Sequence, residues 1–334
     1  MKINPSQLKS YLTDLITHKI DLSAMIWGAP GIGKSSIVRQ VAEEQGLCFV
    51  DVRLSQLAPT DLRGLPVPKD GITCWAPPEF LPRAGKGILF LDEVNMAPPA
   101  MQGVAQQLIL DRRVGNYTVP GGWFVWAAGN RKIDRASVFD MPAPLANRFI
   151  HLELEPCVEN FRLYAFRHGF NDHIVAFVAF RHDLLHKVMP NETSWPSPRS
   201  WEMANKLHQA NLNIEPAVGV SSAAEFYAFL DVVSSIPDIN GIVFGSKQPP
   251  FPEEVSLRYA TVMSLVGKIA SADHALNALR WLIAAASPEW VQLFATDAFP
   301  LLREKKLMAD VQAQVMKEEK LKSFLVSYAR LIGG

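Results

Sequence analysis

Residues 28–35 combine the residue types and spacing that hold a phosphate group. They read Gly-Ala-Pro-Gly-Ile-Gly-Lys-Ser and fit the pattern G-x-x-x-x-G-K-[ST]. Glycines let the backbone curl so that its N–H groups point at the phosphates, and the following helix adds the positive end of its dipole. Lys34 would reach the β- and γ-phosphates, and Ser35 would ligate Mg²⁺. The segment predicts an ATP and Mg²⁺ site formed by Gly28, Pro30, Gly31, Ile32, Gly33, Lys34, Ser35 and Ser36.

Two carboxylates follow an apolar run that begins at Gly87. The run GILFL reads as a buried strand, so Asp92 and Glu93 would lie at the carboxyl edge of a sheet, where open α/β folds bind ligands. Asp92 would hold the Mg²⁺ shell through a water molecule, and Glu93 would orient and polarise an attacking water. Phosphoryl transfer needs positioning and charge stabilisation more than covalent chemistry, so these groups suffice for ATP hydrolysis. The alternative interpretation is an ordinary strand end exposed to solvent.

Strands that alternate with helices must position these residues. Apolar runs predict strands at 24–27, 47–52, 87–91 and 150–154. Helical spacing of apolar residues predicts helices at 34–44 and 98–110. Residues 114–119 and 122–127 are expected to pair with each other across Pro120-Gly121, and 71–75 to form one arm of a hairpin. The alternation predicts an α/β fold, a parallel sheet covered by helices on both faces in the three-layer arrangement of P-loop NTPases.

The pattern changes after Pro156. Strand signals fade, helical spacing continues at 158–168, 171–187 and 198–210, and the proline- and glycine-rich segment 236–252 reads as a linker. We predict a nucleotide-binding core at 1–156, an all-α lid domain at 157–236 and a helical C-terminal extension at 237–334. The first twenty residues read as an amphipathic helix that Ser6 could cap, and the charged segment 305–322 reads as a solvated helical face.

Composition narrows the class of protein. Lysine plus arginine and aspartate plus glutamate number 33 each, so the zero net charge disfavours a nucleic-acid binder. Cys48, Cys74 and Cys157 follow no metal-ligand spacing and read as the reduced thiols of a cytosolic protein. Apolar runs such as 174–180 are far shorter than the roughly 20 residues of a membrane span, and no secretory signal precedes the first motif. We therefore expect a soluble, cytoplasmic protein.

Several segments together resemble the AAA+ ATPases. Residues 28–35 and 89–93 are similar to the Walker A and Walker B motifs of that family. Further segments, in the family's order, resemble its MoxR branch, which is close to the dynein-related ATPases; they are DLRGLP at 61–66, DEVNMAPP at 92–99, AAGN at 127–130, MPAPLANRF at 141–149 and SPR at 197–199. The resemblance covers about residues 20–210 and implies an AAA+ core for the predicted α/β domain.

Three further residues acquire candidate roles. Asn130 follows a predicted strand, and its amide could hydrogen-bond the attacking water or the γ-phosphate; the alternative is a turn-forming asparagine. By resemblance, Arg148 is the arginine finger that enters the neighbouring subunit's site, an effect of about 10³–10⁵ in rate. Arg199 would contact phosphate from the lid. The alternative for both arginines is a structural or surface role.

The finger assignment has rivals within the chain. Asn147 stands where the family has an acid before the finger, and Met96 replaces a usual arginine. Other basic residues near the predicted site could supply the finger instead, namely Arg112, Arg113, Arg131 and Arg135.

An arginine that acts in trans implies a ring. A head-to-tail interface that closes gives a cyclic oligomer, and the resemblance implies a hexamer. The family remodels or activates partner proteins in a chaperone-like way, frequently with a protein that carries a von Willebrand factor A domain, so we expect a protein partner. A nucleic-acid motor and an ATP-operated assembly switch with little turnover are the alternatives; the water-positioning pair Glu93 and Asn130 argues against the switch.

Two insertions, 65–75 and 114–122, are candidate loops for contacting that partner. Each carries one aromatic residue, Trp75 and Tyr117 respectively, that could grip it. The alternative for both aromatics is packing against their own domain.

Overall fold

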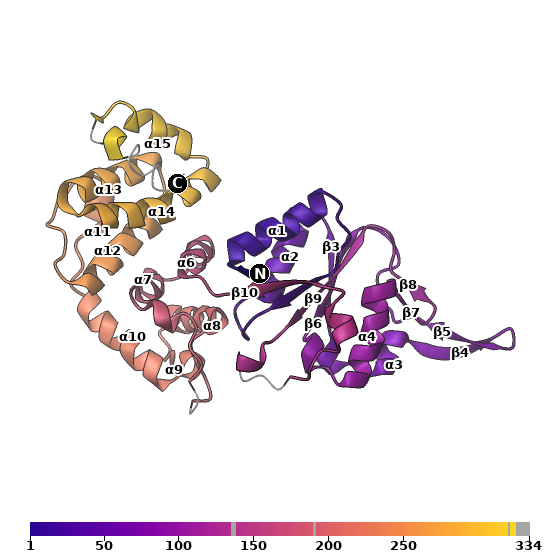
Figure 1. Cartoon of the computed structure of the whole chain (residues 1–334). Helices are drawn as coiled ribbons and strands as arrows, with labels where there is room; N and C mark the ends of the chain where they lie inside the picture. The colour runs from indigo at the N-terminus through magenta and orange to yellow at the C-terminus, as the bar shows by residue number, and fades with distance from the viewer. Residues whose placement is uncertain (135–137, 190–191, 320, 325–334) are drawn as a thin grey trace. The chain divides into compact units, whose positions relative to one another are not determined.

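A sheet of six strands organises the first part of the computed structural model (Figure 1). The strand order is β1-β10-β2-β9-β6-β3, and every neighbouring pair is parallel. The strands are β1 (Lys2–Ile3), β2 (Ala24–Trp27), β3 (Cys48–Arg53), β6 (Gly87–Asp92), β9 (Trp123–Gly129) and β10 (Ile150–Leu154). Because β2, β9 and β6 are adjacent, whatever follows their carboxyl ends is brought together at one edge.

Helices cover both faces of this sheet (Figure 1). Helices α1 (Pro5–Thr17) and α2 (Lys34–Glu44) share a core with the inward side chains of one face, such as Ile88 and Phe90. Helix α4 (Pro99–Asp111), with the short α3 (Pro59–Arg63) beside it, packs on the other face against Leu89 and Leu91. Alternate residues of β6 are thus buried on opposite sides, as a central parallel strand requires. This confirms the predicted three-layer α/β fold class.

The structure describes residues 1–134, 138–189, 192–319 and 321–324. It divides into two units, Met1–Pro156 and Cys157–Gly334. The second unit is helical, and one apolar cluster of buried residues runs through it from Phe161 to Leu321. Its helices are α6 (Val158–Arg167), α7 (Asp172–Phe180), α8 (Pro198–Gln209), α9 (Glu215–Val218), α10 (Val220–Val233), α11 (Ile239–Val243), α12 (Val255–Gly267), α13 (Ala272–Ala285), α14 (Pro288–Glu304) and α15 (Met308–Val315). Among the described residues, no helix is both long and apolar enough to cross a bilayer.

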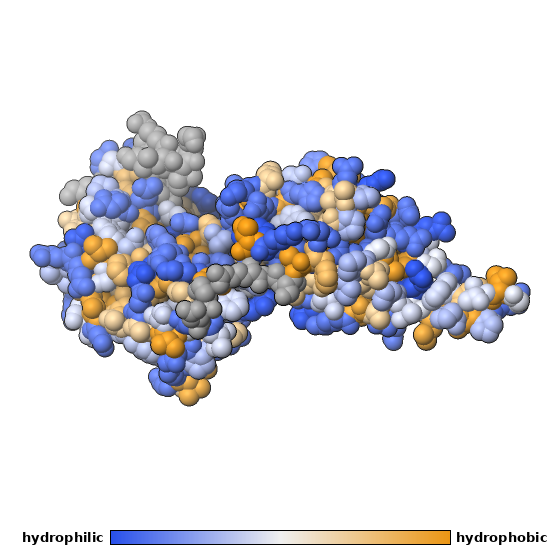
Figure 2. Space-filling view, turned by 60° about the horizontal axis from the view of Figure 1, so that its bottom comes forward, coloured by the Kyte–Doolittle hydropathy of each residue, from blue (hydrophilic) through white to orange (hydrophobic). Residues whose placement is uncertain are grey.

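An antiparallel arm projects from the first unit (Figure 1). It consists of β4 (Leu65–Lys69) and β5 (Ile72–Ala76), joined by a turn with Asp70 and Gly71 at positive φ. One face carries exposed apolar side chains, with Leu65 69%, Val67 40% and Ile72 65% exposed. The space-filling view shows hydrophobic surface at the end of the arm (Figure 2).

Several local expectations were wrong. Residues 114–119 and 122–127 do not pair with each other: β7 (Arg113–Val114) pairs with β8 (Tyr117–Thr118), and β9 enters the central sheet. The continuous apolar run of β9 suits a strand buried on both faces. Asn4, not Ser6, caps α1, in a capping box with Gln7. The helix expected over 171–187 ends at Phe180, and α11 interrupts the expected linker.

Candidate active site

The candidate site lies at the carboxyl ends of β2, β9 and β6. The loop 28–33 follows β2, Asn130 follows β9, and Glu93 follows β6. Gly31 and Gly33 have φ of 81° and 95°, the left-handed region that glycine adopts without strain. Gly28 is confined differently, because a Cβ there would lie 2.9 Å from the carbonyl oxygen of Leu154. The loop thus needs its glycines for conformation and for close approach.

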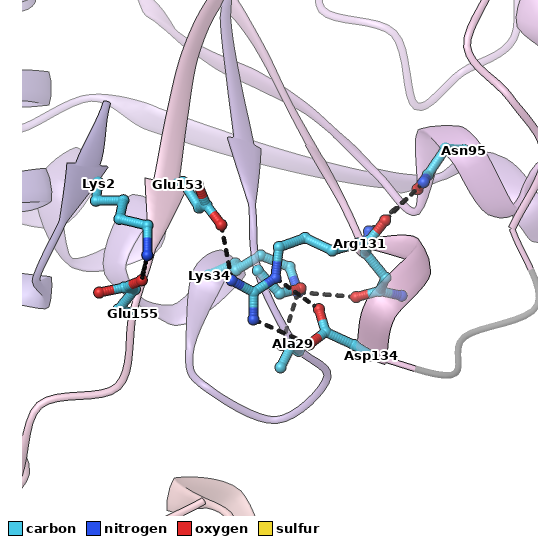
Figure 3. Close-up of polar contacts among 10 residues, drawn as sticks. Lys2, Ala29, Lys34, Asn95, Arg131, Asp134, Glu153 and Glu155 are labelled. Atoms are coloured by element: carbon cyan, nitrogen blue, oxygen red, sulfur yellow. Dashed lines mark hydrogen bonds and ion pairs between the residues drawn. The ribbon is translucent and has the colours of Figure 1, made fainter.

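Lys34 begins α2 and turns its side chain back into the loop. It is 8% exposed. Its Nζ donates to the carbonyl oxygens of Gly28 (2.8 Å) and Ala29 (3.0 Å) and to Oδ1 of Asn130 (2.9 Å). Figure 3 shows Lys34 beside Ala29. Two residues 96 positions apart in the sequence are therefore in direct contact, so one phosphate group could contact both.

Ser35 and Asp92 form the second contact across the site. Ser35 Oγ donates to Asp92 Oδ2 at 2.5 Å, and the other carboxylate oxygen, Oδ1, accepts from the backbone N–H of Glu93 at 2.8 Å. Asp51, on the adjacent β3, adds to the negative charge here. Burial raises the pKa of Asp51, and the charges of Asp92 and Glu93 raise it further, whereas Arg53 and Arg39 lower it. Arg39 Nη2 lies 3.7 Å from Asp51 Oδ2.

Glu93 is held by its backbone and by a serine. Its φ of 58° is in the left-handed region, where a residue other than glycine is strained, and this turns the chain out of β6. Its side chain accepts a short hydrogen bond from Ser55 Oγ. Ser55 lies in the 3-10 turn η1 (Leu54–Gln56) after β3. Sequence reasoning missed Ser55, since no motif or spacing marks it.

Asn130 is fixed through both its backbone and its side chain. It is 8% exposed. The side chain of Asn95, in η2 (Val94–Met96), accepts from the Asn130 N–H (3.1 Å) and donates to its carbonyl oxygen (2.7 Å). The Asn130 side-chain NH₂ donates to Met96 Sδ at 3.1 Å. Met96 Sδ thus lies beside the Asn130 side chain.

Two of the rival arginines are held by contacts within the first unit. Arg131 Nε and Nη2 bond both oxygens of Asp134, and its Nη1 bonds Glu153 at 2.8 Å (Figure 3). Those bonds raise the pKa of Arg131 further above its ordinary value. Arg112 pairs with Asp21 at 2.6 Å. Neither guanidinium is free to reach another subunit without breaking these contacts.

Arg148, Arg113 and Arg199 are exposed. Arg148 follows the short α5 (Ala143–Ala146), and its side chain makes no polar contact with the part of the chain that the structure describes. Arg113 is also exposed, and Arg135 lies outside the described residues. Arg199 is exposed in the first turn of α8, which Ser197 caps. Arg199 belongs to the helical unit.

The two candidate gripping aromatics differ. Tyr117 is 6% exposed and its hydroxyl donates to the carbonyl oxygen of Pro82 at 2.6 Å, so it packs within its own domain and cannot grip a partner. Trp75 is half-buried at the base of the arm, with the guanidinium of Arg63 5.3 Å from its ring centre. The aromatics anchor their loops, whereas the exposed apolar residues of the arm are aliphatic.

Comparison with known proteins gives weak structural similarities and one family match. A search among curated proteins found no match. Among solved structures, a variant of RuvB from Thermotoga maritima has 16% identity and a TM-score of 0.43, covering 81% of this chain and 87% of that chain. NtrX from Brucella abortus in complex with ADP has 14% identity and a TM-score of 0.37, covering 91% and 68%. A putative ATPase from Cytophaga hutchinsonii has 15% identity and a TM-score of 0.32, covering 87% and 80%.

One family model matches part of the chain. The AAA domain of the dynein-related subfamily matches residues 23–136. The matched segment contains the glycine loop, both acids and Asn130, while Arg148 and Arg199 lie beyond it. Residues 23–136 of this chain are therefore similar to an AAA domain of the dynein-related subfamily.

Proposed function

We propose that this chain hydrolyses ATP at the interfaces of a ring of its own copies and uses the energy to remodel or activate a partner protein. The observation that carries the proposal is the convergence of Lys34, Asn130 and the Ser35–Asp92 pair at one sheet edge. A lysine at the start of a helix, beside a glycine loop, suits the β- and γ-phosphates. The remaining loop residues, Pro30, Ile32 and Ser36 included, would complete the cradle.

The donor set fits Mg²⁺. Ser35 Oγ and Asp92 Oδ2 are hard oxygen ligands only 2.5 Å apart, so one cation could bind both. Mg²⁺ is commonly held by one or two protein oxygens, with phosphates and waters completing the octahedron. When bound, Mg²⁺ would neutralise charge on the phosphate oxygens.

The reaction needs a water in line with the γ-phosphate. Its oxygen would bond to the γ-phosphorus as the bond to the leaving ADP oxygen breaks. Glu93 would orient this water and take up its proton, and the Asn130 amide would hydrogen-bond the water or the γ-phosphate. The Ser55 bond engages one oxygen of the Glu93 carboxylate and restrains its orientation, while the carboxylate keeps further acceptor sites for the water.

Arg148 is the proposed finger, because the family resemblance selects it over Arg113, which is also exposed. The structure shows it exposed and without a polar partner among the described residues, while Arg131 and Arg112 are engaged within the core. A finger that acts in trans must be accessible on the subunit surface. A site completed by a neighbour requires a ring, and the MoxR resemblance supports six subunits. We propose that Arg199 contacts phosphate from the lid.

Mixing two inactive variants tests the trans geometry. Glu93→Gln should bind ATP without hydrolysing it, and Arg148→Ala should fail to supply the finger. Mixed together they should recover phosphate release, because a Glu93-intact subunit then meets an Arg148-intact neighbour. Arg113→Ala, which removes another exposed arginine, is the matched control and should retain wild-type turnover. Mixtures that stay inactive would refute the trans role.

Particle mass tests the ring. Light scattering on Glu93→Gln with ATP should show assembly to a hexamer, with phosphate release lost in the same sample. A monomer or dimer that still hydrolyses ATP in the wild type would contradict the ring and leave a self-contained ATPase.

The exposed apolar arm supports a protein partner. Leu65, Val67 and Ile72 present aliphatic surface on one face, and such patches commonly mark contacts between proteins. The ATP-trapped Glu93→Gln ring is the bait, and the same ring with Leu65→Ser and Ile72→Ser is the control. The resemblance supports a partner with a von Willebrand factor A domain in the cytoplasm; purification that recovers no such protein would remove that part of the proposal.

One observation favours a second candidate, an ATP-operated assembly switch with little turnover. The Ser55–Glu93 hydrogen bond occupies one acceptor site of the carboxylate and restrains its orientation. A wild type that assembles with ATP yet releases phosphate no faster than Glu93→Gln would establish the switch in place of the motor.

A further inference from the structure

Asn95 is a buried amide that the proposed reaction does not use. It lies two residues after Glu93 and is 4% exposed. Both ends of its side-chain amide bond the backbone of Asn130: Nδ2 donates to the carbonyl oxygen at 2.7 Å, and Oδ1 accepts from the N–H at 3.1 Å. Figure 3 shows Asn95 turned towards this chain segment. The side chain therefore acts on another residue's main chain.

The need for this contact follows from the sheet. Strand β6 pairs with β9 only as far as Leu91 opposite Ala127, since Glu93 turns the chain away. Strand β9 continues to Gly129, so the buried peptide groups of Asn130 lose β6 as a partner. Buried main-chain groups must be paired. The Asn95 amide has the donor and the acceptor of a peptide group. It makes the two hydrogen bonds to the Asn130 backbone that strand β6 does not supply.

The fit is close enough to constrain neighbouring residues. A Cβ on Gly129 would lie 2.5 Å from Asn95 Oδ1, so a larger residue there would displace the amide. On the other side, the backbone carbonyl of Asn95 accepts from the Phe139 N–H at 2.7 Å. Asn95 thus ties the end of β9 to the turn that carries Glu93 and to the segment leading towards α5.

We propose that Asn95 is the positioning residue for Asn130. The inference rests on the proposed function, in which Asn130 meets the γ-phosphate or the attacking water. By holding the Asn130 backbone, Asn95 keeps the Asn130 amide within 2.9 Å of Lys34 Nζ. Removing it lets the amide shift, and a displacement of about 1 Å in a catalytic site can cost on the order of 10²-fold in rate.

Hydrogen–deuterium exchange tests the contact without reference to turnover. In Asn95→Ala, exchange in the peptide spanning 123–134 should accelerate, while peptides from α2 should keep the wild-type rate. The matched control is Gln102→Ala, because Gln102 is another fully buried amide nearby that donates to the Ala97 carbonyl oxygen at 3.0 Å and does not touch Asn130. Unchanged exchange in 123–134 would overturn the inference whether or not the protein hydrolyses ATP.

Nucleotide measurements test the consequence. Asn95→Ala should lower kcat by about 10- to 100-fold with KM for ATP within about threefold, and its ratio of ADP to ATP dissociation constants should match that of Asn130→Ala. Gln102→Ala should lose thermal stability but keep kcat. If the wild type binds ATP without hydrolysing it, the proposed hydrolysis is wrong. The ratio of ADP to ATP dissociation constants, compared between Asn95→Ala and Asn130→Ala, still tests the role of Asn95 in that case. A loss of kcat equal in Asn95→Ala and Gln102→Ala would reduce Asn95 to a structural residue.

A carboxylate in place of the amide gives a pH signature. Asn95→Asp keeps an acceptor for the Asn130 N–H but places a second acceptor against its carbonyl oxygen. Protonation of that carboxylate restores the donor, so turnover of Asn95→Asp relative to wild type should rise as the pH falls. Parallel pH profiles for the two proteins would contradict a hydrogen-bonding role for this amide.

Discussion

The ion pair between Arg162 on α6 and Asp297 on α14 is buried, with side chains 3% and 0% exposed. Arg162 Nη2 donates to Asp297 Oδ1 at 3.2 Å, whereas Nε and Oδ2 lie 3.0 Å apart without hydrogen-bond alignment. Burial raises the pKa of Asp297 to about 6, although Arg162 opposes the rise. The pair is therefore desolvated at both ends and incompletely hydrogen-bonded.

Breaking this pair should cost much more than replacing it. Asp297→Ala leaves an uncompensated buried guanidinium, which we expect to lower the unfolding free energy of the helical unit by about 3–5 kcal/mol. Arg162→Met combined with Asp297→Leu removes both charges and fills the space, and should be neutral or stabilising by about 1–4 kcal/mol. Urea titration followed by circular dichroism at pH 7.5 measures both. Asp297→Ala within about 1 kcal/mol of wild type would refute the reasoning, since that is the behaviour of a solvated pair.

Three other perturbations have defined outcomes. Ser55→Ala frees Glu93 from its hydrogen bond and should raise basal phosphate release; an unchanged or lower rate would count against restraint by Ser55. Burial raises the pKa of Asp172 to about 6 from 3.8, equivalent to about 3 kcal/mol. Between these pH values the folded state stays protonated at Asp172 while the unfolded state ionises, so this stability is present below pH 3.8 and is lost as the pH rises to about 6. Asp172→Asn should therefore flatten this part of the curve of unfolding free energy against pH, measured by urea titration. An unaltered curve would contradict the pKa shift. Tyr117→Phe, which leaves the Pro82 carbonyl without its donor, should cost about 1–3 kcal/mol in thermal unfolding without changing turnover, and an effect on partner capture would reopen a gripping role.

Residues whose position follows from local pattern could be predicted from the sequence. The glycine loop and the acidic pair each sit where a buried apolar run stops, and parallel strands place such ends at one edge. That reasoning anticipates the contact between Ser35 and Asp92. The fold class followed from the same alternation of strands and helices. The roles of the individual side chains remain predictions.

The parts missed depend on tertiary contacts. Ser55 lies in an irregular turn, and only the parallel pairing of β3 with β6 brings it to Glu93. Asn95 stood inside the quoted acidic motif, yet its partner is the backbone of a residue 35 positions away. The pairing of β9 was predicted wrongly because Pro120-Gly121 suggested a hairpin. Its unbroken apolar run was the stronger signal, since a strand with one solvated face would alternate.

The register of the projecting arm has a consequence for solubility. Every β4 residue has a β5 partner, and the two-residue turn between Lys69 and Ile72 makes Leu65, Val67 and Lys69 the hydrogen-bonded positions. The main-chain nitrogens of the two alternate residues therefore point to the open edge of β4. Those residues are Pro66 and Pro68, which carry no N–H. On the other edge, the Trp75 N–H is already taken by the Asn116 side chain at 3.2 Å. An edge strand with free N–H groups can pair with the edge strand of a neighbouring molecule, and repeated pairing of this kind produces aggregates. The prolines block that growth and leave the apolar side chains as the arm's means of attachment.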